Sequence, residues 1–264
     1  MRSYLILVTC LVLLLCLGAA FAQQPPPSAN PASSIAAGMA KSGDGMTISF
    51  GRTFTQTPIV ITNAQWNGKA LSSCASSVST SSFTVSIRDE NKQPVVKANV
   101  QWVAFIPSAD NKVIGGALTA NHNQQISFAS MGGGPVILCN AVKNGAALNA
   151  CAVNNAVTGF TAAIRDQDNV TIQGATLYWM AVVPNSTNKF QGDVATRSNG
   201  ATVTVSPAFP RTPIYWVCAQ YGREPYACYA INPTSASFNL TLCSHSGPGG
   251  SNVWTQWLGW ARQK

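Results

Sequence analysis

Charged residues and histidines are scarce in this chain, and their scarcity excludes several kinds of function. Only 9% of the 264 residues are charged, with eight carboxylates and two histidines, His122 and His245. The sequence has no Gly-x-Ser-x-Gly elbow, no His-Glu-x-x-His pair and no phosphate-binding loop, which are the motifs of common hydrolases and nucleotide-binding proteins. We therefore predict that the protein is not an enzyme, has no catalytic residues and needs no cofactor.

Runs of basic residues and clusters of metal ligands are also missing. The net charge is +8, yet no Lys/Arg run of the kind that marks a nucleic-acid patch occurs. No Cys-x-x-Cys pair or Cys/His cluster suggests zinc. The segment 166–169 is rich in oxygen ligands, but Thr171 stands where a calcium-binding EF-hand needs glycine, and Leu177 where it needs glutamate. We expect neither nucleic acid nor metal as a partner.

The first 22 residues are typical of a secretory signal peptide. Arg2 precedes an apolar run from Tyr4 to Cys16, and Ala20-Phe21-Ala22 forms a small-x-small cleavage site. A membrane anchor is the alternative, because the run is nearly long enough to span a bilayer. The cleavage site leads into a Pro-rich flexible leader at 23–34, which favours the signal peptide. We expect a secreted, extracellular protein that is not inserted in a membrane after cleavage.

One pattern of apolar segments then occurs three times. Each copy has a proline followed by two apolar residues and, further on, a tryptophan in an apolar run that ends in Ala or Gly. The spacing from copy to copy is 77 and then 78 residues for both landmarks, which are Pro58, Pro135 and Pro213, and Trp102, Trp179 and Trp257. Repeats of this length suit complete small domains rather than solenoid units of about 20–50 residues. We place the repeats at 35–107, 112–184 and 189–262.

Within each repeat the periodicity is that of β-strands. Apolar and polar residues alternate through Phe83–Arg88, Phe160–Arg165 and Phe238–Cys243, as expected for strands with one solvated face. Asn67-Gly68 and Asn144-Gly145 lie between apolar runs and predict two-residue hairpins, because both central residues must adopt positive φ. No helical stripe is sustained after the leader. The sequence therefore predicts an all-β protein made of three tandem small antiparallel β-sandwiches.

The order of these segments resembles the H-type lectin domain, the family of snail agglutinins and of the C-terminal domains of the discoidins. The resemblance covers residues 35–262 three times and is carried by the spaced pattern Pro-apolar-apolar, Phe-x-apolar-x-apolar and apolar-x-Trp-apolar-Ala. It implies six-stranded antiparallel sandwiches, assembly as a parallel trimer, and sugar sites near the clefts between subunits. We therefore expect an intrachain pseudo-trimer that acts as a lectin and binds cell-surface or extracellular glycans multivalently. We also allow for self-association of the chain.

The resemblance implies sugar-binding residues that are incompletely retained. The family site usually draws on an Arg in the middle strand and a Trp-His pair after the Phe-x-apolar strand. The third copy comes closest, with Arg223 and His245, whereas Lys69 and Ala147 stand near the Arg position in the other two. This departure leaves the sugar specificity open. It also leaves a second hypothesis, a structural subunit of an extracellular coat or filament that keeps the fold without binding sugar.

Two further groups are candidate sugar contacts on their own chemistry. Trp66 and Tyr221 lie on predicted turns, where a ring can stack on a sugar. The alternative is that they pack between repeats. The strand-end pairs Arg88-Asp89 and Arg165-Asp166 either bond sugar hydroxyls, form salt bridges between neighbouring repeats or lie at a solvated edge.

Cysteine usage suits an oxidising compartment. Removal of Cys10 and Cys16 with the signal peptide leaves six of the eight cysteines, an even number. We predict local disulfides Cys139–Cys151 and Cys218–Cys228. The remaining residues, Cys74 and Cys243, would then either close a ring of repeats or link separate chains.

Three Asn-x-Ser/Thr sequons fit a secreted surface. They begin at Asn169, Asn185 and Asn239 and predict glycosylation in a host that glycosylates.

Overall fold

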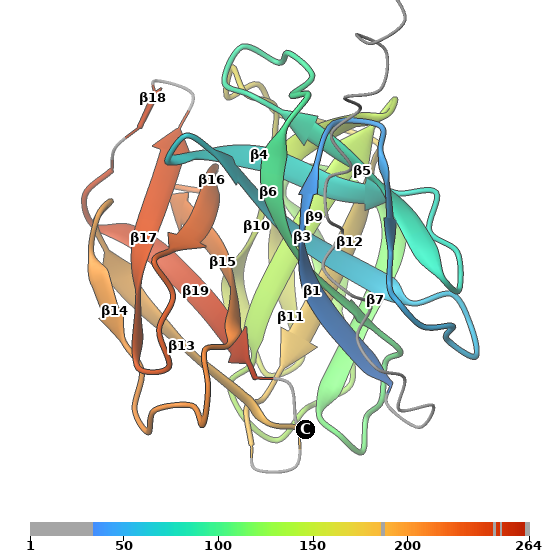
Figure 1. Cartoon of the computed structure of the whole chain (residues 1–264), viewed down its shortest axis with the longest axis vertical. Helices are drawn as coiled ribbons and strands as arrows, with labels where there is room; N and C mark the ends of the chain where they lie inside the picture. The colour runs from blue at the N-terminus through green and yellow to red at the C-terminus, as the bar shows by residue number, and fades with distance from the viewer. Residues whose placement is uncertain (1–33, 186–187, 245–246, 249, 262–264) are drawn as a thin grey trace, which may run out of the picture.

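The computed structural model describes residues 34–185, 188–244, 247–248 and 250–261. The predicted signal peptide, almost all of the leader and His245 lie outside the described residues. Within these ranges the chain forms three curled antiparallel sheets, two with six strands and one with seven (Figure 1). No helix among the described residues is long and apolar enough to cross a membrane.

The first sheet has the strand order β1-β6-β3-β4-β5-β2. Its strands are β1 (Ile35–Ser42), β2 (Thr47–Ser49), β3 (Ile59–Trp66), β4 (Lys69–Ser76), β5 (Ser82–Arg88) and β6 (Ala98–Phe105).

The second sheet repeats this order as β7-β12-β9-β10-β11-β8. Its strands are β7 (Val113–Ala120), β8 (Gln124–Ser127), β9 (Val136–Lys143), β10 (Ala146–Ala156), β11 (Gly159–Arg165) and β12 (Ala175–Val182).

The third sheet has the order β13-β19-β15-β16-β17-β14, and the short strand β18 pairs with β17. Its strands are β13 (Phe190–Arg197), β14 (Thr202–Thr204), β15 (Ile214–Tyr221), β16 (Glu224–Ile231), β17 (Ser237–Ser244), β18 (Gly247–Pro248) and β19 (Val253–Trp260). Three repeats of one β-topology are therefore present, as the sequence predicts.

Each sheet folds into a sandwich because one strand pairs in two halves. The residues 69–71 of β4 pair with β3, whereas its residues 72–76 pair with β5. The sheet turns over between the two halves, so its inner face encloses a core. In the first repeat this core contains Phe50, Phe83 and Trp102, whose rings lie 5.5–6.0 Å apart.

The predicted hairpins are present. Asn67-Gly68 and Asn144-Gly145 both have positive φ and join β3 to β4 and β9 to β10. The third repeat achieves the same turn with Gly222-Arg223, where φ is 55° and 69°. Two-residue turns of this kind match the twist of the strands that they connect.

The outer faces of the three sandwiches meet in a shared apolar core. All three repeats contribute to it, and Trp216 at its centre is fully buried. Its members are Ile61, Val103, Phe105, Val113, Val136, Leu138, Cys151, Met180, Val182, Phe190, Trp216, Cys218 and Leu258. Strands β4, β10 and β16 also contact one another, one from each repeat. Because the repeats bury apolar area against each other, they form one packed body rather than a string of beads.

Buried hydrogen bonds join the repeats in a cycle. Asn140 of the second repeat accepts from the amide of Thr62 in the first at 2.6 Å and donates to its carbonyl at 3.0 Å. Asn63 of the first repeat binds Val217 of the third in the same way, at 2.7 and 3.1 Å. Cys218 of the third repeat closes the cycle, because its thiol donates to the carbonyl of Ala150 in the second at 3.5 Å. Asn63, Asn140 and Cys218 occupy equivalent positions, opposite residues 101, 178 and 256 in the strand registers.

The structure contradicts the predicted local disulfides, because all six described cysteines are free. Extending the β9–β10 register places Ala150, not Cys151, opposite Cys139. Cys139 therefore faces the core of its own repeat, whereas Cys151 faces the shared core. The β15–β16 register separates Cys218 and Cys228 by the same single residue, since Ala219 pairs with Tyr226. Neighbouring strands bring only same-face side chains together, so neither pair can bond.

The Cys74–Cys243 bond is also absent. Cys74 packs with Val142 and Ala147 of the second repeat. Cys243 packs with Ala70 of the first repeat, so it lies on a contact between repeats as its replacement of an outward-facing Arg predicts. The two sulfurs thus lie in different contacts between repeats.

We expect Asn140→Ala to destabilise the protein by about 2 to 4 kcal/mol, because two buried backbone groups of Thr62 lose their partners at about 1 to 3 kcal/mol each. Denaturant unfolding of the full chain measures this change. Asn91→Ala, in an exposed turn, is the control and should change the free energy of unfolding by less than about 0.5 kcal/mol. Equal stability of the two variants would contradict a role for the buried cycle.

We also expect all six thiols to be alkylated after unfolding without any reductant, and to resist alkylation in the native protein. Burial raises the pKa of Cys74 and Cys139, so the reactive thiolate is disfavoured as well as inaccessible. Mass spectrometry of chain treated with iodoacetamide counts the labels. Peptides joined by a disulfide in the unreduced sample would contradict the structure.

Candidate functional site

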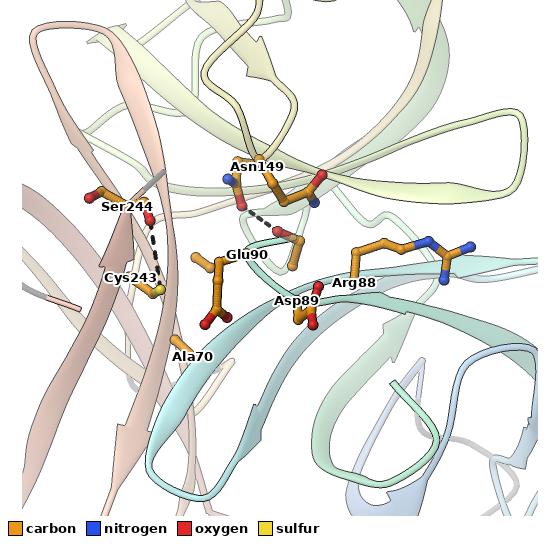
Figure 2. A pocket seen from close by; sticks show the side chains of 10 residues that line it. Ala70, Arg88, Asp89, Glu90, Asn149, Cys243 and Ser244 are labelled. Carbon is orange, nitrogen blue, oxygen red and sulfur yellow. Dashed lines mark hydrogen bonds between the residues drawn. The ribbon is translucent and has the colours of Figure 1, made fainter. Parts of the chain in front are cut away.

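A small hollow opens where the three repeats meet. Its lining comes from all three: Ala70, Ser72, Arg88, Asp89, Glu90, Asn149, Gln167, Ala227, Cys243 and Ser244 (Figure 2). Across it, the hydroxyl of Ser72 donates to Oδ1 of Asn149 at 2.6 Å. The cavity volume is about 10 Å³, room for about one water molecule. Arg88 and Asp89 both line the hollow, which is too small to admit a sugar.

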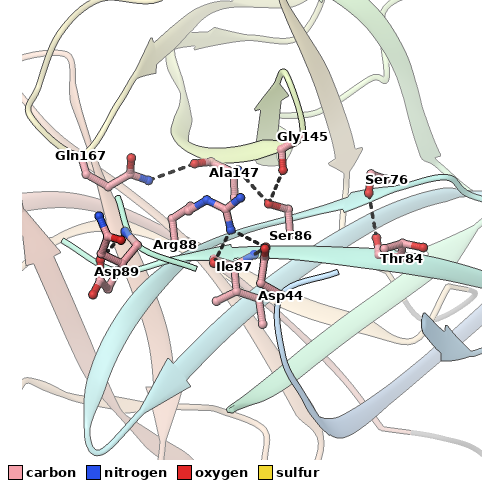
Figure 3. A network of polar contacts seen from close by, with 11 residues as sticks. Asp44, Ser76, Thr84, Ser86, Ile87, Arg88, Asp89, Gly145, Ala147 and Gln167 are labelled. Atoms are coloured by element: carbon pink, nitrogen blue, oxygen red, sulfur yellow. Dashed lines mark hydrogen bonds and ion pairs between the residues drawn. The ribbon is translucent and has the colours of Figure 1, made fainter. Parts of the chain in front are cut away.

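The guanidinium of Arg88 is turned away from this hollow and bound within its own repeat (Figure 3). Its Nη1 lies 2.5 Å from Oδ1 of Asp44 and donates to the Ile87 carbonyl at 3.0 Å. Burial raises the pKa of Asp44, but hydrogen bonds from Arg88 and from the Ile87 amide outweigh it and hold the pKa below its usual value. Arg88 thus fixes the turn that carries Asp44.

Asp89 and Asp166 form the same loop in the first two repeats. Oδ1 of Asp89 accepts from the amides of Asn91 and Gln93, at 2.9 and 2.8 Å. Oδ1 of Asp166 accepts from the amides of Asp168 and Val170, at 3.0 and 2.9 Å. Such Asx turns hold the loop through backbone hydrogen bonds.

A salt bridge joins these two loops across repeats. Lys92 of the first repeat lies 2.8 Å from Oδ2 of Asp166 and 2.5 Å from Oδ2 of Asp168 in the second. The structure thus places Asp166 in an ion pair between neighbouring repeats, which is the alternative to sugar contact.

The two aromatic candidates differ. Trp66 packs against the core of the first repeat, and the ammonium of Lys97 lies 5.0 Å from its ring centroid. Tyr221 is 56% exposed on the β15–β16 hairpin, beside the exposed Arg223. Of these two candidates, Tyr221 is the one that presents an aromatic face of the kind that stacks on a sugar.

The second and third repeats bring together three basic side chains. Arg165 ends β11, and Arg223 lies on the hairpin of the third repeat. Both lie near enough to His122, in the turn between β7 and β8, for their charges to lower its pKa. We call His122, Arg165 and Arg223 the basic cleft. It combines two predicted candidates with one residue that the sequence analysis did not select.

His122 belongs to a set of equivalent turn residues. Oδ1 of Asp44 and of Asn199 accepts from the amides of Ile87 and Leu242, each at 2.8 Å. Nδ1 of His122 lies 3.1 Å from both the amide and the carbonyl of Ile164. Because the other repeats place an oxygen acceptor here, we assign Nδ1 as the acceptor, which requires neutral histidine with its proton on Nε2. The sequence signal was the 78- and 77-residue spacing of the three positions.

His245 lies outside the described residues and is therefore not included in the basic cleft. The three sequon asparagines are half-buried. The side-chain amide of Asn239 donates to Thr202 at 3.4 Å. Their glycosylation stays a prediction. In the described part of the chain, no group of three or more His, Cys, Asp or Glu residues could hold a metal ion.

No family model, no curated protein and no solved structure matches this chain. The resemblance to H-type lectins therefore stays a prediction that rests on the spacing of the strands.

We expect the stability of the protein to fall below about pH 6.5 through His122. Burial lowers the pKa of this histidine from its ordinary 6.5, and the charge of Arg165 lowers it further. The unfolded chain thus takes up the proton first, so stability present above pH 6.5 is lost as the pH falls through the folded pKa. Unfolding free energies at pH 7, 6 and 5 measure the loss.

The matched variant is His122→Asn, which copies Asn199 of the third repeat. It should remove a slope of up to about 1.4 kcal/mol per pH unit, the maximum for one proton. A wild-type pH profile that the substitution leaves unchanged would show that His122 is not the titrating group.

Proposed function

We propose that this chain is a secreted carbohydrate-binding protein whose three repeats form a pseudo-trimer and bind glycans multivalently. The proposal combines the strand pattern that resembles H-type lectins with the way the repeats close on one another. It also assigns residues 1–22 to a signal peptide.

The cyclic contacts support the pseudo-trimer. Each repeat reaches the next through a buried residue at an equivalent position, and the bonds run from second to first, first to third and third to second. Equivalent bonds in a closed cycle are what an approximate threefold axis produces. Several binding sites on one body would raise the avidity for clustered glycans by effective concentration.

The basic cleft is the observation that carries the sugar-binding part of the proposal. Arg223 is exposed and offers a planar set of donors, Tyr221 beside it is 56% exposed, and His122 offers a ring nitrogen. An aromatic face with a few converging polar groups is the usual chemistry of a sugar site. In the first repeat, by contrast, Arg88 and Lys69 are held in ion pairs with Asp44 and Glu90.

A structural subunit of an extracellular coat or filament is the second candidate. The observation that favours it is the engagement of Arg88, Asp166 and Lys92 in contacts within and between repeats. Charged groups that hold the fold are not free to bind a ligand.

A glycan array probed with the labelled mature protein tests the proposal. We expect binding to at least one glycan, and at least a tenfold weaker affinity for Arg223→Ala, which corresponds to about 1.4 kcal/mol for a lost donor to a sugar hydroxyl. Lys41→Ala removes the same charge from an exposed edge-strand position and should leave binding unchanged.

Two outcomes would count against the proposal. Binding that Arg223→Ala leaves intact would remove the basic cleft as its site. No binding to any glycan, with folded protein that assembles into higher oligomers, would instead favour the coat or filament subunit.

A further inference from the structure

The outer strand of the third repeat breaks a pattern that the first two repeats share. Positions 36 and 114 on β1 and β7 are apolar: Ala36 is a core residue, and Ile114 packs on the core. The equivalent residue of β13 is Gln191, by its register with β19. A polar side chain thus stands where the other repeats close over their cores.

The next inward-facing position changes more sharply. Gly38 and Gly116 lie opposite Trp102 and Trp179, whereas Asp193 lies opposite Trp257. A Cβ on Gly38 would lie 2.6 Å from the Trp102 ring, and one on Gly116 would lie 3.0 Å from Nε1 of Trp179. The indole covers the glycine in both repeats, so a side chain at either position would require the ring to move. The third repeat carries a carboxylate there.

A groove lies along this altered edge. It is open to solvent and has a volume of about 700 Å³, within the usual range for small-molecule sites. Its lining includes Lys189, Gln191, Asp193, Thr204, Phe209 and Trp257. The third repeat has Val205 before the loop that carries Phe209, where the first two have Phe50 and Phe128 stacked near their tryptophans. A smaller residue at this end of the core accompanies the open groove.

Asp193 is the charged group in the groove with capacity for a ligand. Its side chain is 55% exposed and binds Arg197 through Oδ2 at 2.8 Å. Its Oδ1 accepts from the adjacent Val194 amide at 2.7 Å. An ionised carboxylate can accept about four hydrogen bonds, so Asp193 can also accept from the hydroxyl of a ligand.

The geometry points to a binding groove for one neutral sugar residue along β13 of the third repeat, with Gln191, Asp193 and Thr204 bonding its hydroxyls and the exposed Pro207 and Pro210 supplying apolar surface. It carries one lysine and one carboxylate, a balance that suits an uncharged ligand with many hydroxyls. The inference rests on the proposed function and adds a site that belongs to one repeat alone. The basic cleft, by contrast, lies between two repeats.

Calorimetry and tryptophan fluorescence on the full mature chain test the groove. The probes are the methyl glycosides of glucose, galactose, mannose, N-acetylglucosamine and N-acetylgalactosamine. We expect at least one to bind and to change the fluorescence, because Trp257 lines the groove.

The sharpest variants copy the other repeats. Asp193→Gly introduces the glycine found at the equivalent positions 38 and 116. Gln191→Ile introduces the isoleucine found at the equivalent position 114. Each should weaken glycoside binding at least tenfold while the protein stays folded by circular dichroism. Asp110→Gly, at an exposed position between the first two repeats, is the control and should bind as wild type does.

The outcomes separate the groove from the proposed function. Wild-type affinity in both groove variants would overturn the groove, and a loss on Arg223→Ala in the same experiment would move binding to the basic cleft. Absence of glycoside binding to the wild-type chain would also overturn the groove. The proposed function would then stand if the glycan array is positive and fall with the groove if it is negative.

Discussion

The architecture depends on the burial of three sandwich faces against one another. A sandwich of about 70 residues has a small core of its own, and its outward face here is apolar rather than solvated. Burying Trp216, Leu138 and Phe105 together turns three marginal domains into one body with a larger interior. The hydrogen bonds of the Asn63 and Asn140 side-chain amides lie in that interior. They require one relative placement of the repeats, because a shifted arrangement would leave buried backbone groups without partners. Apolar packing supplies the stability, and the buried side-chain amides fix the placement of the repeats relative to one another.

On this common framework, equivalent positions carry different chemistry. The turn after the first strand of each repeat holds Asp44, His122 or Asn199. Each of these residues accepts a hydrogen bond from the equivalent backbone amide of its own repeat. The accepting atom is kept while the charge and the titration behaviour change. The chemistry also differs at the end of the fifth strand, where the charged Arg88 and Arg165 correspond to the thiol of Cys243. At positions 44, 122 and 199 the fold requires only a hydrogen-bond acceptor at one atom, so the charge of the side chain can differ between repeats.

Much of the fold could be predicted because its signals are local. Alternation through Phe83–Arg88 indicates a strand whatever packs against it, and Asn67-Gly68 specifies its turn by backbone conformation alone. The disulfides could not be predicted in this way. A shift of one residue in register decides whether Cys139 and Cys151 share a face, and register is set by the packing of both faces of the sheet.

The candidate sites show the same difference between what local sequence predicts and what depends on packing. Arg165 and Arg223 were selected from the sequence, but their proximity to His122 depends on which repeats are neighbours in space. The groove was missed although its signal was present. Gln191 and Asp193 interrupt an alternation that Ala36, Gly38 and Ile114 preserve, and only comparison of the three copies by strand register reveals it.

The short linkers between repeats, at residues 106–112 and 183–189, have a consequence for how such a protein can change. In an assembly of three identical chains, any mutation appears three times, so a new binding surface must be tolerated at every interface at once. Joining the copies in one chain removes that restriction. One copy can then acquire a carboxylate or lose a guanidinium while the other two preserve the assembly. A tandem gene of this kind can specialise its parts separately, and a single molecule can come to recognise several different surfaces.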